Sequence, residues 1–445
     1  MIPDNISFIH DFKRAGPSYY NLKNVDIDSG PHLNYSSYPH GRFRTPNHCF
    51  SGRLASTRNS TYQTFKQAKK SKRFMIYEIG LVESPDVWLE DISKQSNKKN
   101  KLNIFDLIYQ NNPKLYLQVR KGRAIIHLDQ SMEAFPLYCQ NTSHSDLGTR
   151  NFYKIIHDKL SHYKISPSSI HYSTSNLYEI AIYNRWCSDN NIKDKLVIHQ
   201  YNFFAQAARH AGFFQQPDDK SASITFEEHL SFKNKNDIKT FSNLNRVVRD
   251  HRCGLLYMLN YYDLINNSET SFSQDDHPHQ LPYPDHPAWQ KHNVFAANQL
   301  LPLTLDVTNF NINQAQNFFK ETYLNTWYSV ITETYFQDYF KYSMFFSEKI
   351  FKPMRARHPI VLVGQPYALA ELTKLGFKTF NEFWDESYDV CRNPTERLEK
   401  ICKLIAQLNK LSKTEWIDLY KRMEPVLEHN YNHVIFTDWD GEINV

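Results

Sequence analysis

Short apolar runs alternate with longer stretches of helical spacing along most of the chain. The runs have the length and the content of buried strands, and they lie at Phe74–Ile79, Ala124–Leu128, Ile170–Ser173, Leu196–Tyr201, Lys239–Leu244, Tyr328–Thr332 and Ile360–Val363. Between them, apolar residues recur at three- and four-residue steps, which predicts helices at Leu102–Gln110, Thr149–Tyr163, Leu177–Asn190, Asp250–Ile265 and Thr395–Leu411. Such alternation is typical of an α/β protein with a mostly parallel sheet.

Three further segments complete the pattern of the second half. Phe377–Phe380 predicts a short strand, and Thr414–Met423 predicts a last helix that stops before Pro425. The polar stretch Asn266–Trp289 is rich in proline, which predicts a loop.

The length of the chain indicates two domains. A chain of 445 residues is too long for one ordinary core. Pro, Asp, Lys and Ser cluster at Gln215–Ser223, which predicts a linker. We therefore expect domains at residues 1–222, of which the first 60 are polar and irregular, and at residues 223–445. Two Rossmann-like α/β domains facing a cleft would place a ligand there, at the carboxyl ends of the strands.

Composition narrows the class of protein only in part. A hydrophobic share of 41% indicates a globular chain, and the net charge of +5 is compatible with an anionic ligand such as a nucleotide or a nucleic acid. The six cysteines are scattered without a C-x-x-C pair, so they predict neither a zinc site nor a disulfide framework. We expect a cytoplasmic protein and, because no run approaches roughly 20 apolar residues, no membrane span.

Acidic groups that resemble metal ligands stand in unfavourable places. The D-x-D triplets at Asp26–Asp28 and Asp438–Asp440 lie near the ends of the chain, and Asp275–His279 lies within the proline-rich stretch. We expect these groups on exposed loops and predict no metal site.

A first candidate site follows the strand Tyr328–Thr332. Ser347 stands where a helix N-cap is expected, Glu348 and Lys349 follow in the first turn, and Lys352 comes one turn later. A carboxylate can accept hydrogen bonds from ribose hydroxyls, while a lysine and a helix N-terminus neutralise phosphate. The pattern predicts a nucleotide-sugar site; the alternative is an ordinary helix start.

A second candidate site follows the strand Lys239–Leu244. Asn245 leads into three arginines at three-residue spacing, Arg246, Arg249 and Arg252, which stand between the strand and a helix. Guanidinium groups bind phosphate oxygens bidentately, so these arginines can meet a diphosphate. The alternative is a solvated basic helix start, but cations at a helix N-terminus are unfavourable unless an anion is bound there.

With these residues the second half, over about residues 239–390, resembles the donor-binding domain of the α1,3-fucosyltransferase family of GT-B glycosyltransferases. That family has a strand ending in E-N, a loop, T-E-K opening a helix, and then a strand with proline and glycine. The counterparts here are Ile331–Thr334, Ser347–Lys349 and Pro359–Gly364, and Asn243, Asn245 and Arg249 match an N-x-N motif followed by an arginine. The chain also resembles glycosyltransferase-like proteins of phages and marine bacteria.

The resemblance implies a transferase that uses a nucleoside-diphosphate sugar as co-substrate and needs no other cofactor. Arg249 and Lys349 would hold the diphosphate and Glu348 the ribose. Thr334 stands where the family has asparagine, and Phe351–Arg357 is bulkier and more basic than the family helix. These departures leave the sugar and the nucleotide open.

The acceptor side belongs to the first half, which shows no such resemblance. An inverting transfer needs a general base, and Asp129 and Glu133, just past the strand Ala124–Leu128, are the best-placed carboxylates, with Asp146 a lesser candidate. The acceptor is a glycan or modified DNA; the basic run Lys66–Arg73 and the pair Arg42 and Arg44 favour a polyanion. The alternative function is a non-catalytic module that binds nucleotide or glycan.

Overall fold

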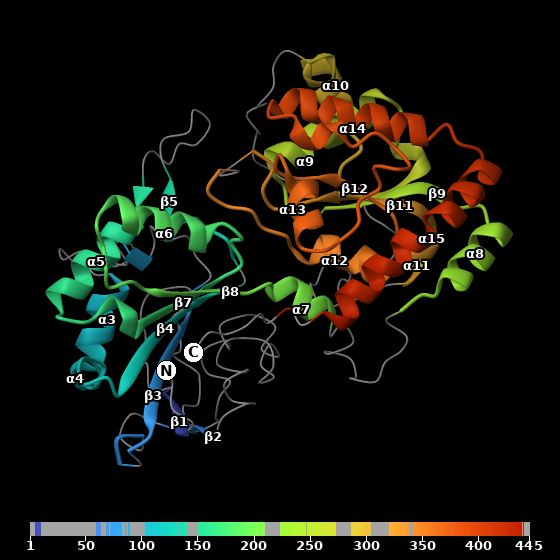
Figure 1. Cartoon of the computed structure of the whole chain (residues 1–445). Coiled ribbons are helices and arrows are strands. Elements are labelled where there is room, and N and C mark those ends of the chain that lie inside the picture. Colours follow the sequence, from blue (N-terminus) through green and yellow to red (C-terminus); the bar gives the residue numbers. More distant parts are fainter. Residues whose placement is uncertain are drawn as a thin grey trace. The chain divides into compact units, whose positions relative to one another are not determined.

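The structure is a computed structural model, and it describes most of the chain but not all of it. The described residues are 5–9, 59–63, 68–70, 72–81, 85, 88–89, 103–131, 133–139, 150–209, 223–245, 247–272, 286–303, 320–337, 341–437 and 439. They form two compact units, which are described separately (Figure 1).

Unit 1 comprises residues 1–203 together with two short later segments, 341–345 and 438–445. Its sheet has the strand order β2-β1-β3-β4-β7-β8, and every neighbouring pair is parallel. The strands are β1 (Asn5–Ile9), β2 (Asn59–Gln63), β3 (Phe74–Gly80), β4 (Ala124–Gln130), β7 (Ile170–Thr174) and β8 (Val197–Gln200). A separate antiparallel ribbon joins β5 (Tyr138–Cys139) and β6 (Arg150–Asn151).

The core of unit 1 lies on one face of this sheet. Helices α3 (Ile104–Asn111), α4 (Pro113–Arg120), α5 (Phe152–His162) and α6 (Glu179–Asp189) bury their apolar stripes there. They pack against alternate strand residues such as Ile126, Leu128 and Tyr172. The residues between them on β4 and β7, including His127 and Asp129, therefore point to the opposite face.

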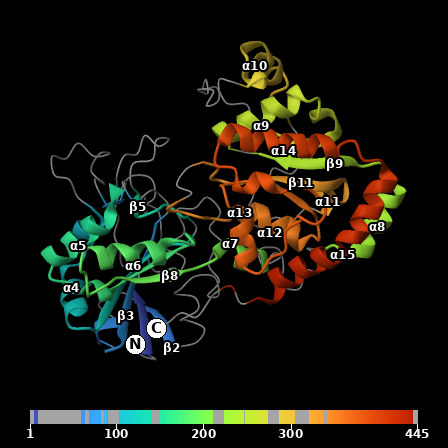
Figure 2. The ribbon, with the colours of Figure 1, turned by 45° about the horizontal axis from the view of Figure 1, so that its top comes forward.

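Unit 2 comprises residues 204–340 and 346–437. Its parallel sheet has the order β10-β9-β11-β12, formed by β10 (Ser268–Ser271), β9 (Lys239–Leu244), β11 (Thr326–Thr332) and β12 (Ile360–Val363). Helices α9 (Asp250–Tyr261) and α14 (Pro394–Leu408) cover one face, and α12 (Glu348–Arg355) and α15 (Lys413–Phe436) cover the other (Figures 1 and 2). The remaining helices are α7 (Phe203–Arg209), α8 (Phe226–Lys235), α10 (Lys291–Asn298), α11 (Lys320–Leu324) and α13 (Ala368–Lys374).

The predicted fold class is confirmed, since each unit is an α/β layer built on a parallel sheet. Strands β9 and β12 have the predicted bounds, and β7 and β11 differ by one or two residues. The compact units divide after Phe203, whereas the sequence placed the domain boundary after residue 222, and the segment 341–345 returns to unit 1.

Three predictions about unit 2 were wrong. Phe377–Phe380 is no strand, because side chains satisfy its backbone: the Lys378 amide donates to Asn430 Oδ1 (2.8 Å) and the Phe380 amide donates to Glu386 Oε1 (3.0 Å). The stretch predicted as a loop contains β10, an edge strand whose residues are all polar.

The third error concerns the last helix, which continues through Pro425 to Phe436. A proline removes one helical hydrogen bond, but the apolar stripe goes on beyond it with Val426, Leu427 and Val434 buried. Burial of this stripe outweighs the local cost of the proline.

Candidate functional site

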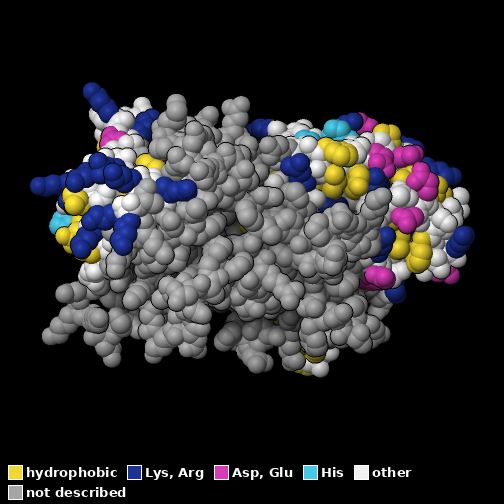
Figure 3. All heavy atoms as spheres, turned by 90° about the horizontal axis from the view of Figure 1, so that it is seen from below, with side chains coloured by type: hydrophobic (Ala, Val, Ile, Leu, Met, Phe, Trp, Pro, Cys, Tyr) yellow, Lys and Arg dark blue, Asp and Glu magenta, His cyan; other side chains and the backbone are white. Residues whose placement is uncertain are grey.

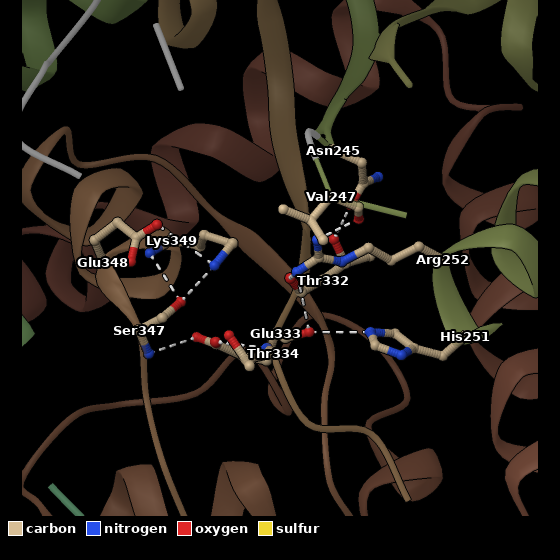
Figure 4. A network of polar contacts seen from close by, with 10 residues as sticks. All are labelled: Asn245, Val247, His251, Arg252, Thr332, Glu333, Thr334, Ser347, Glu348 and Lys349. Carbon is tan, nitrogen blue, oxygen red and sulfur yellow. Dashed lines mark hydrogen bonds and ion pairs between the residues drawn. The ribbon is translucent and has the colours of Figure 1, made fainter. Parts of the chain in front are cut away.

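Three strands of unit 2 end at one edge of its sheet. Because β9, β11 and β12 are parallel, the segments that follow Leu244, Thr332 and Val363 leave the sheet on the same side. Helices α9 and α12 begin there, so the two candidate sites of the sequence meet at this carboxyl edge (Figure 4).

Asn245 is held in place at the end of β9 by a buried chain of hydrogen bonds. Its Nδ2 donates to Asn243 Oδ1 (2.7 Å), and Asn243 Nδ2 donates to the carbonyl of Val330 (2.8 Å). The Thr332 hydroxyl donates to Asn245 Oδ1, so the loop after β9 is fastened to the end of β11.

Of the three predicted arginines, Arg252 is buried and bound to backbone. Its Nη1 donates to the carbonyl of Val247 (2.8 Å), and its Nη2 donates to the carbonyls of Thr332 (3.2 Å) and Glu333 (3.4 Å). Burial lowers the pKa of Arg252 to about 10. These contacts place Arg252 as a support of the loop, so its predicted contact with a ligand remains a prediction.

Arg249 differs from Arg252 in exposure. It stands at the N-cap position of α9, where its side chain makes no capping hydrogen bond, and it is exposed. The positive charge of Arg249 lowers the pKa of the neighbouring Arg252, so the two guanidinium groups are close. Arg249 is therefore placed to meet an external anion. Arg246, the third predicted arginine, lies outside the described residues.

Glu333 joins the end of β11 to the start of α12. The side chain is 2% exposed, and its two carboxylate oxygens accept hydrogen bonds from the amides of Ser347 (3.1 Å) and Thr334 (3.2 Å). Burial raises the pKa of Glu333 above its ordinary value. The Glu333 carbonyl also accepts a hydrogen bond from His251 Nε2 (3.0 Å), and burial lowers the pKa of His251 to about 3, so that this ring is neutral.

The first turn of α12 carries a compact group of charges. Ser347 caps the helix, and Lys349 Nζ donates to the Ser347 hydroxyl (3.0 Å) and lies 3.4 Å from Glu348 Oε1. Burial opposes the ionisation of Glu348, but the charges of Lys349 and Lys352 hold its pKa below the ordinary value. Burial also lowers the pKa of Lys352, to about 8.

This edge can hold a ligand that combines hydroxyl groups with a multiply charged anion. Glu348 is ionised and its side chain is 18% exposed, so it can accept hydrogen bonds from a diol. Arg249, Lys349 and Lys352 supply positive charge, and the N-terminus of α12 adds about half a unit. Thr334, the last predicted donor-binding residue, is half-buried beside Glu333.

The two carboxylates predicted as general bases lie at the carboxyl edge of the other sheet. Asp129 stands near the end of β4, is 3% exposed and accepts a hydrogen bond from the Ser131 amide (3.0 Å). Glu133 is half-buried, and its carbonyl accepts a hydrogen bond from the Ser175 amide (3.3 Å). Their catalytic role stays a prediction. Asp146 lies outside the described residues.

Sequence reasoning missed one buried acid in unit 1. Glu179, at the start of α6, is fully buried and accepts hydrogen bonds from the Tyr153 hydroxyl (2.6 Å) and Asn176 Nδ2 (2.8 Å). Burial raises its pKa to about 7. Asn176 also donates to the carbonyl of Tyr342 (2.9 Å), so this network fastens the returning segment 341–345. Partners that far apart in sequence leave no local signal.

The described residues contain no group of three or more His, Cys, Asp or Glu side chains arranged to hold a metal ion. Nor does any described helix have the length and apolar content needed to cross a bilayer. The D-x-D triplets and Asp275–His279 fall outside the described residues, apart from Trp439.

Solved structures that are weakly similar to the chain include two that bear on its fold. No family model and no curated protein matches the chain. The chain is similar to an α,α-trehalose-phosphate synthase (UDP-forming) from Burkholderia vietnamiensis, with 10% identity, a TM-score of 0.33 and coverage of 84% of this chain and 94% of that chain. It is also similar to UGT71G1 of Medicago truncatula complexed with UDP-glucose, with 10% identity, a TM-score of 0.26 and coverage of 82% and 92%. At TM-scores this low, neither likeness shows a function for the chain.

The contacts of Arg252 generate a stability prediction. Replacing Arg252 by methionine removes the Arg252 donor from the carbonyls of Val247 and Thr332 and one of two donors from the carbonyl of Glu333, so we expect a loss of about 1–3 kcal/mol of unfolding free energy. The matched control Arg249→Met, at an exposed position, should change stability by less than about 0.5 kcal/mol. Urea unfolding followed by circular dichroism measures both. Equal stability of Arg252→Met and the wild type would contradict the structural role.

Proposed function

We propose that the chain is a GT-B-like glycosyltransferase that binds a nucleoside-diphosphate sugar at the carboxyl edge of unit 2. The observation that carries the proposal is the grouping of an ionised carboxylate with several cations at the start of α12, on the same sheet edge as the exposed Arg249. Glu348 takes the ribose hydroxyls, while Arg249, Lys349 and Lys352 take the diphosphate. A structural salt-bridge cluster would not need an exposed, uncompensated arginine beside it.

The same cations serve the chemical step. When the bond between the sugar's anomeric carbon and the diphosphate oxygen breaks, negative charge grows on the departing diphosphate. Arg249, Lys349, Lys352 and the N-terminus of α12 stabilise this charge from fixed positions. No metal ion is required in this mechanism, because the charge is neutralised by side chains.

The acceptor hydroxyl attacks the anomeric carbon from the opposite side, which inverts the configuration. A general base takes the hydroxyl proton as the new bond forms. We assign this role to a unit 1 carboxylate, with Glu133 and Asp129 as the two candidates. Glu133 is the more accessible of the two, since Asp129 is 3% exposed. The acceptor is a glycan or a modified DNA base.

The separate roles of Glu348 and Arg249 can be tested with two ligands. Arg249→Gln should weaken binding of both inorganic pyrophosphate and the best nucleoside diphosphate by roughly 10- to 100-fold, because a charge-assisted contact is worth about 1.5–3 kcal/mol. Glu348→Gln should weaken only the nucleoside diphosphate, since pyrophosphate has no ribose. Titration calorimetry measures the affinities, after a thermal-shift comparison of GDP, UDP, ADP and CDP selects the nucleotide.

Arg422→Gln is the matched control for these variants, because Arg422 is an exposed arginine on α15. It should bind both ligands as the wild type does. If Arg249→Gln and Glu348→Gln also keep wild-type affinity for the nucleotide, the site is assigned to the wrong residues.

The lowered pKa of Lys352 predicts how binding depends on pH. A bound diphosphate favours the ammonium form, so the pKa of Lys352 rises in the complex, and affinity should be flat between about pH 7, where the terminal phosphate is fully ionised, and about pH 8. Above that pH the free protein loses the proton, and affinity should fall by up to about tenfold per pH unit. Lys352→Arg stays protonated and should remove this fall. Identical pH profiles for the two proteins would exclude Lys352 from the phosphate site.

A further inference from the structure

The amino edge of the unit 1 sheet, which lies opposite the carboxyl edge with Asp129 and Glu133, carries an unusual concentration of positive charge. Four segments lead into the amino ends of neighbouring strands: residues 68–73 before β3, 120–123 before β4, 163–169 before β7 and 190–196 before β8. Their described residues include one acid, Asp194, and ten basic residues: Lys69, Lys70, Lys72, Arg73, Arg120, Lys121, Arg123, Lys164, Lys193 and Lys195. We call this set the basic edge.

Nine of the ten basic side chains of the basic edge are exposed, and none of these nine forms an ion pair with a described residue. Arg73 is half-buried, and its guanidinium donates to the carbonyl of Ile6 (3.4 Å). Asp194 accepts hydrogen bonds from the Ser166 hydroxyl (2.6 Å) and the Ser168 amide (3.2 Å), so it is engaged in its own loop. In the space-filling view, dark-blue Lys and Arg side chains gather on this unit with little magenta among them (Figure 3).

The macrodipoles of neighbouring helices explain only part of this concentration of basic residues. Helices α4, α5 and α6 end at the basic edge, and each C-terminus carries about half a negative charge that favours a nearby cation. Three such ends supply roughly 1.5 charges, far fewer than ten basic residues. The backbone conformation does not explain the lysines either. Lys72 (φ 56°) and Lys164 (φ 53°) adopt the left-handed conformation, which favours glycine. Gly122 adopts the same conformation before β4.

The shape of the basic edge suits a linear polyanion. Neighbouring strands are about 4.8 Å apart, so the four segments from β3 to β8 form a row roughly 15 Å long. The phosphates of a DNA strand rise about 3.4 Å each along the helix axis, so the length of the row matches the rise of four or five nucleotides. The seven-residue strand β4 separates the row by about 20 Å from the edge that holds Asp129 and Glu133.

The residue types in the four segments distinguish among a lipid surface, a single nucleic-acid strand and a duplex. The described residues of the four segments include no exposed apolar side chain that could insert into a lipid surface. They include no exposed aromatic ring on which the bases of a single strand could stack, since Tyr163 is half-buried and its hydroxyl donates to Asp106 (2.7 Å). Lysines and arginines alone bind the phosphate backbone of a duplex without reading its sequence.

We propose that the basic edge of unit 1 is a docking surface for the phosphate backbone of duplex nucleic acid, separate from the carboxyl edge where the acceptor chemistry is assigned. The surface holds the duplex through charge alone. Binding is therefore independent of sequence and weakens steeply with salt. The proposal does not depend on the sugar-transfer activity, because it concerns binding to another edge of the molecule.

The test measures binding of a fluorescent duplex of about 20 base pairs by anisotropy at salt concentrations from about 50 to 200 mM. The variant combines Lys70→Gln, Lys121→Gln, Arg123→Gln and Lys193→Gln, at exposed positions whose backbone is not in the left-handed conformation. Removing four phosphate contacts should reduce the slope of log affinity against log salt by about 3–4. Affinity at about 100 mM salt should fall at least tenfold.

The matched control removes four exposed lysines from unit 2, with Lys235→Gln, Lys378→Gln, Lys410→Gln and Lys421→Gln. It has the same net charge as the first variant and should bind the duplex within about twofold of the wild type. Circular dichroism and thermal unfolding verify that both variants are folded.

Three outcomes would overturn the proposal. The first is no binding of the duplex by the wild type at the lowest salt. The second is an equal loss in both variants, which would indicate net charge rather than a surface. The third is binding to vesicles containing an anionic lipid without binding to the duplex, which would assign the basic edge to a membrane.

Discussion

The buried carboxylate of Glu333 is the interaction on which the candidate site depends. By accepting hydrogen bonds from the amides of Ser347 and Thr334, it fixes the N-terminus of α12 relative to the end of β11. The chain between these points leaves unit 2 and returns, because residues 341–345 belong to unit 1. The rest of α12 is held by its buried residues Ile350, Phe351 and Met354, and Glu333 adds a polar link at the charged first turn. A single buried acid thus ties this first turn to the end of β11.

The polar residues of this edge form two groups, one buried and bonded within the protein and one exposed at the surface. Asn245, His251 and Arg252 are buried, and their polar groups form hydrogen bonds within unit 2: His251 and Arg252 to backbone carbonyls, Asn245 to the side chains of Asn243 and Thr332. Arg249, Glu348 and Lys349 keep part of their polar surface exposed at the edge. Burial is tolerated in the first group because its hydrogen bonds are made within the protein, whereas the polar groups of the second remain accessible to solvent and to a ligand.

The sequence predicted the elements of the site better than the roles within it. Strands β9, β11 and β12 are short apolar runs with strong local signals, and the polar residues that follow them were found for that reason. Spacing alone could not separate Arg249 from Arg252, because the difference lies in contacts with β11, about 80 residues later. The strand β10 and the helix beyond Pro425 were missed because tertiary contacts override a weak or contrary local pattern. Glu333 was visible as a motif residue, but its link to Ser347 exists only in three dimensions.

Hydrogen–deuterium exchange tests the central claim most directly. With a saturating nucleoside diphosphate, the account predicts slower exchange at the first-turn amides of α12 and in the segment Val247–His251, and no change in strands β3 and β4 of unit 1. Protection confined to other parts of the chain, or no protection at either segment under saturating ligand, would contradict the assignment of the nucleotide site to the carboxyl edge of unit 2.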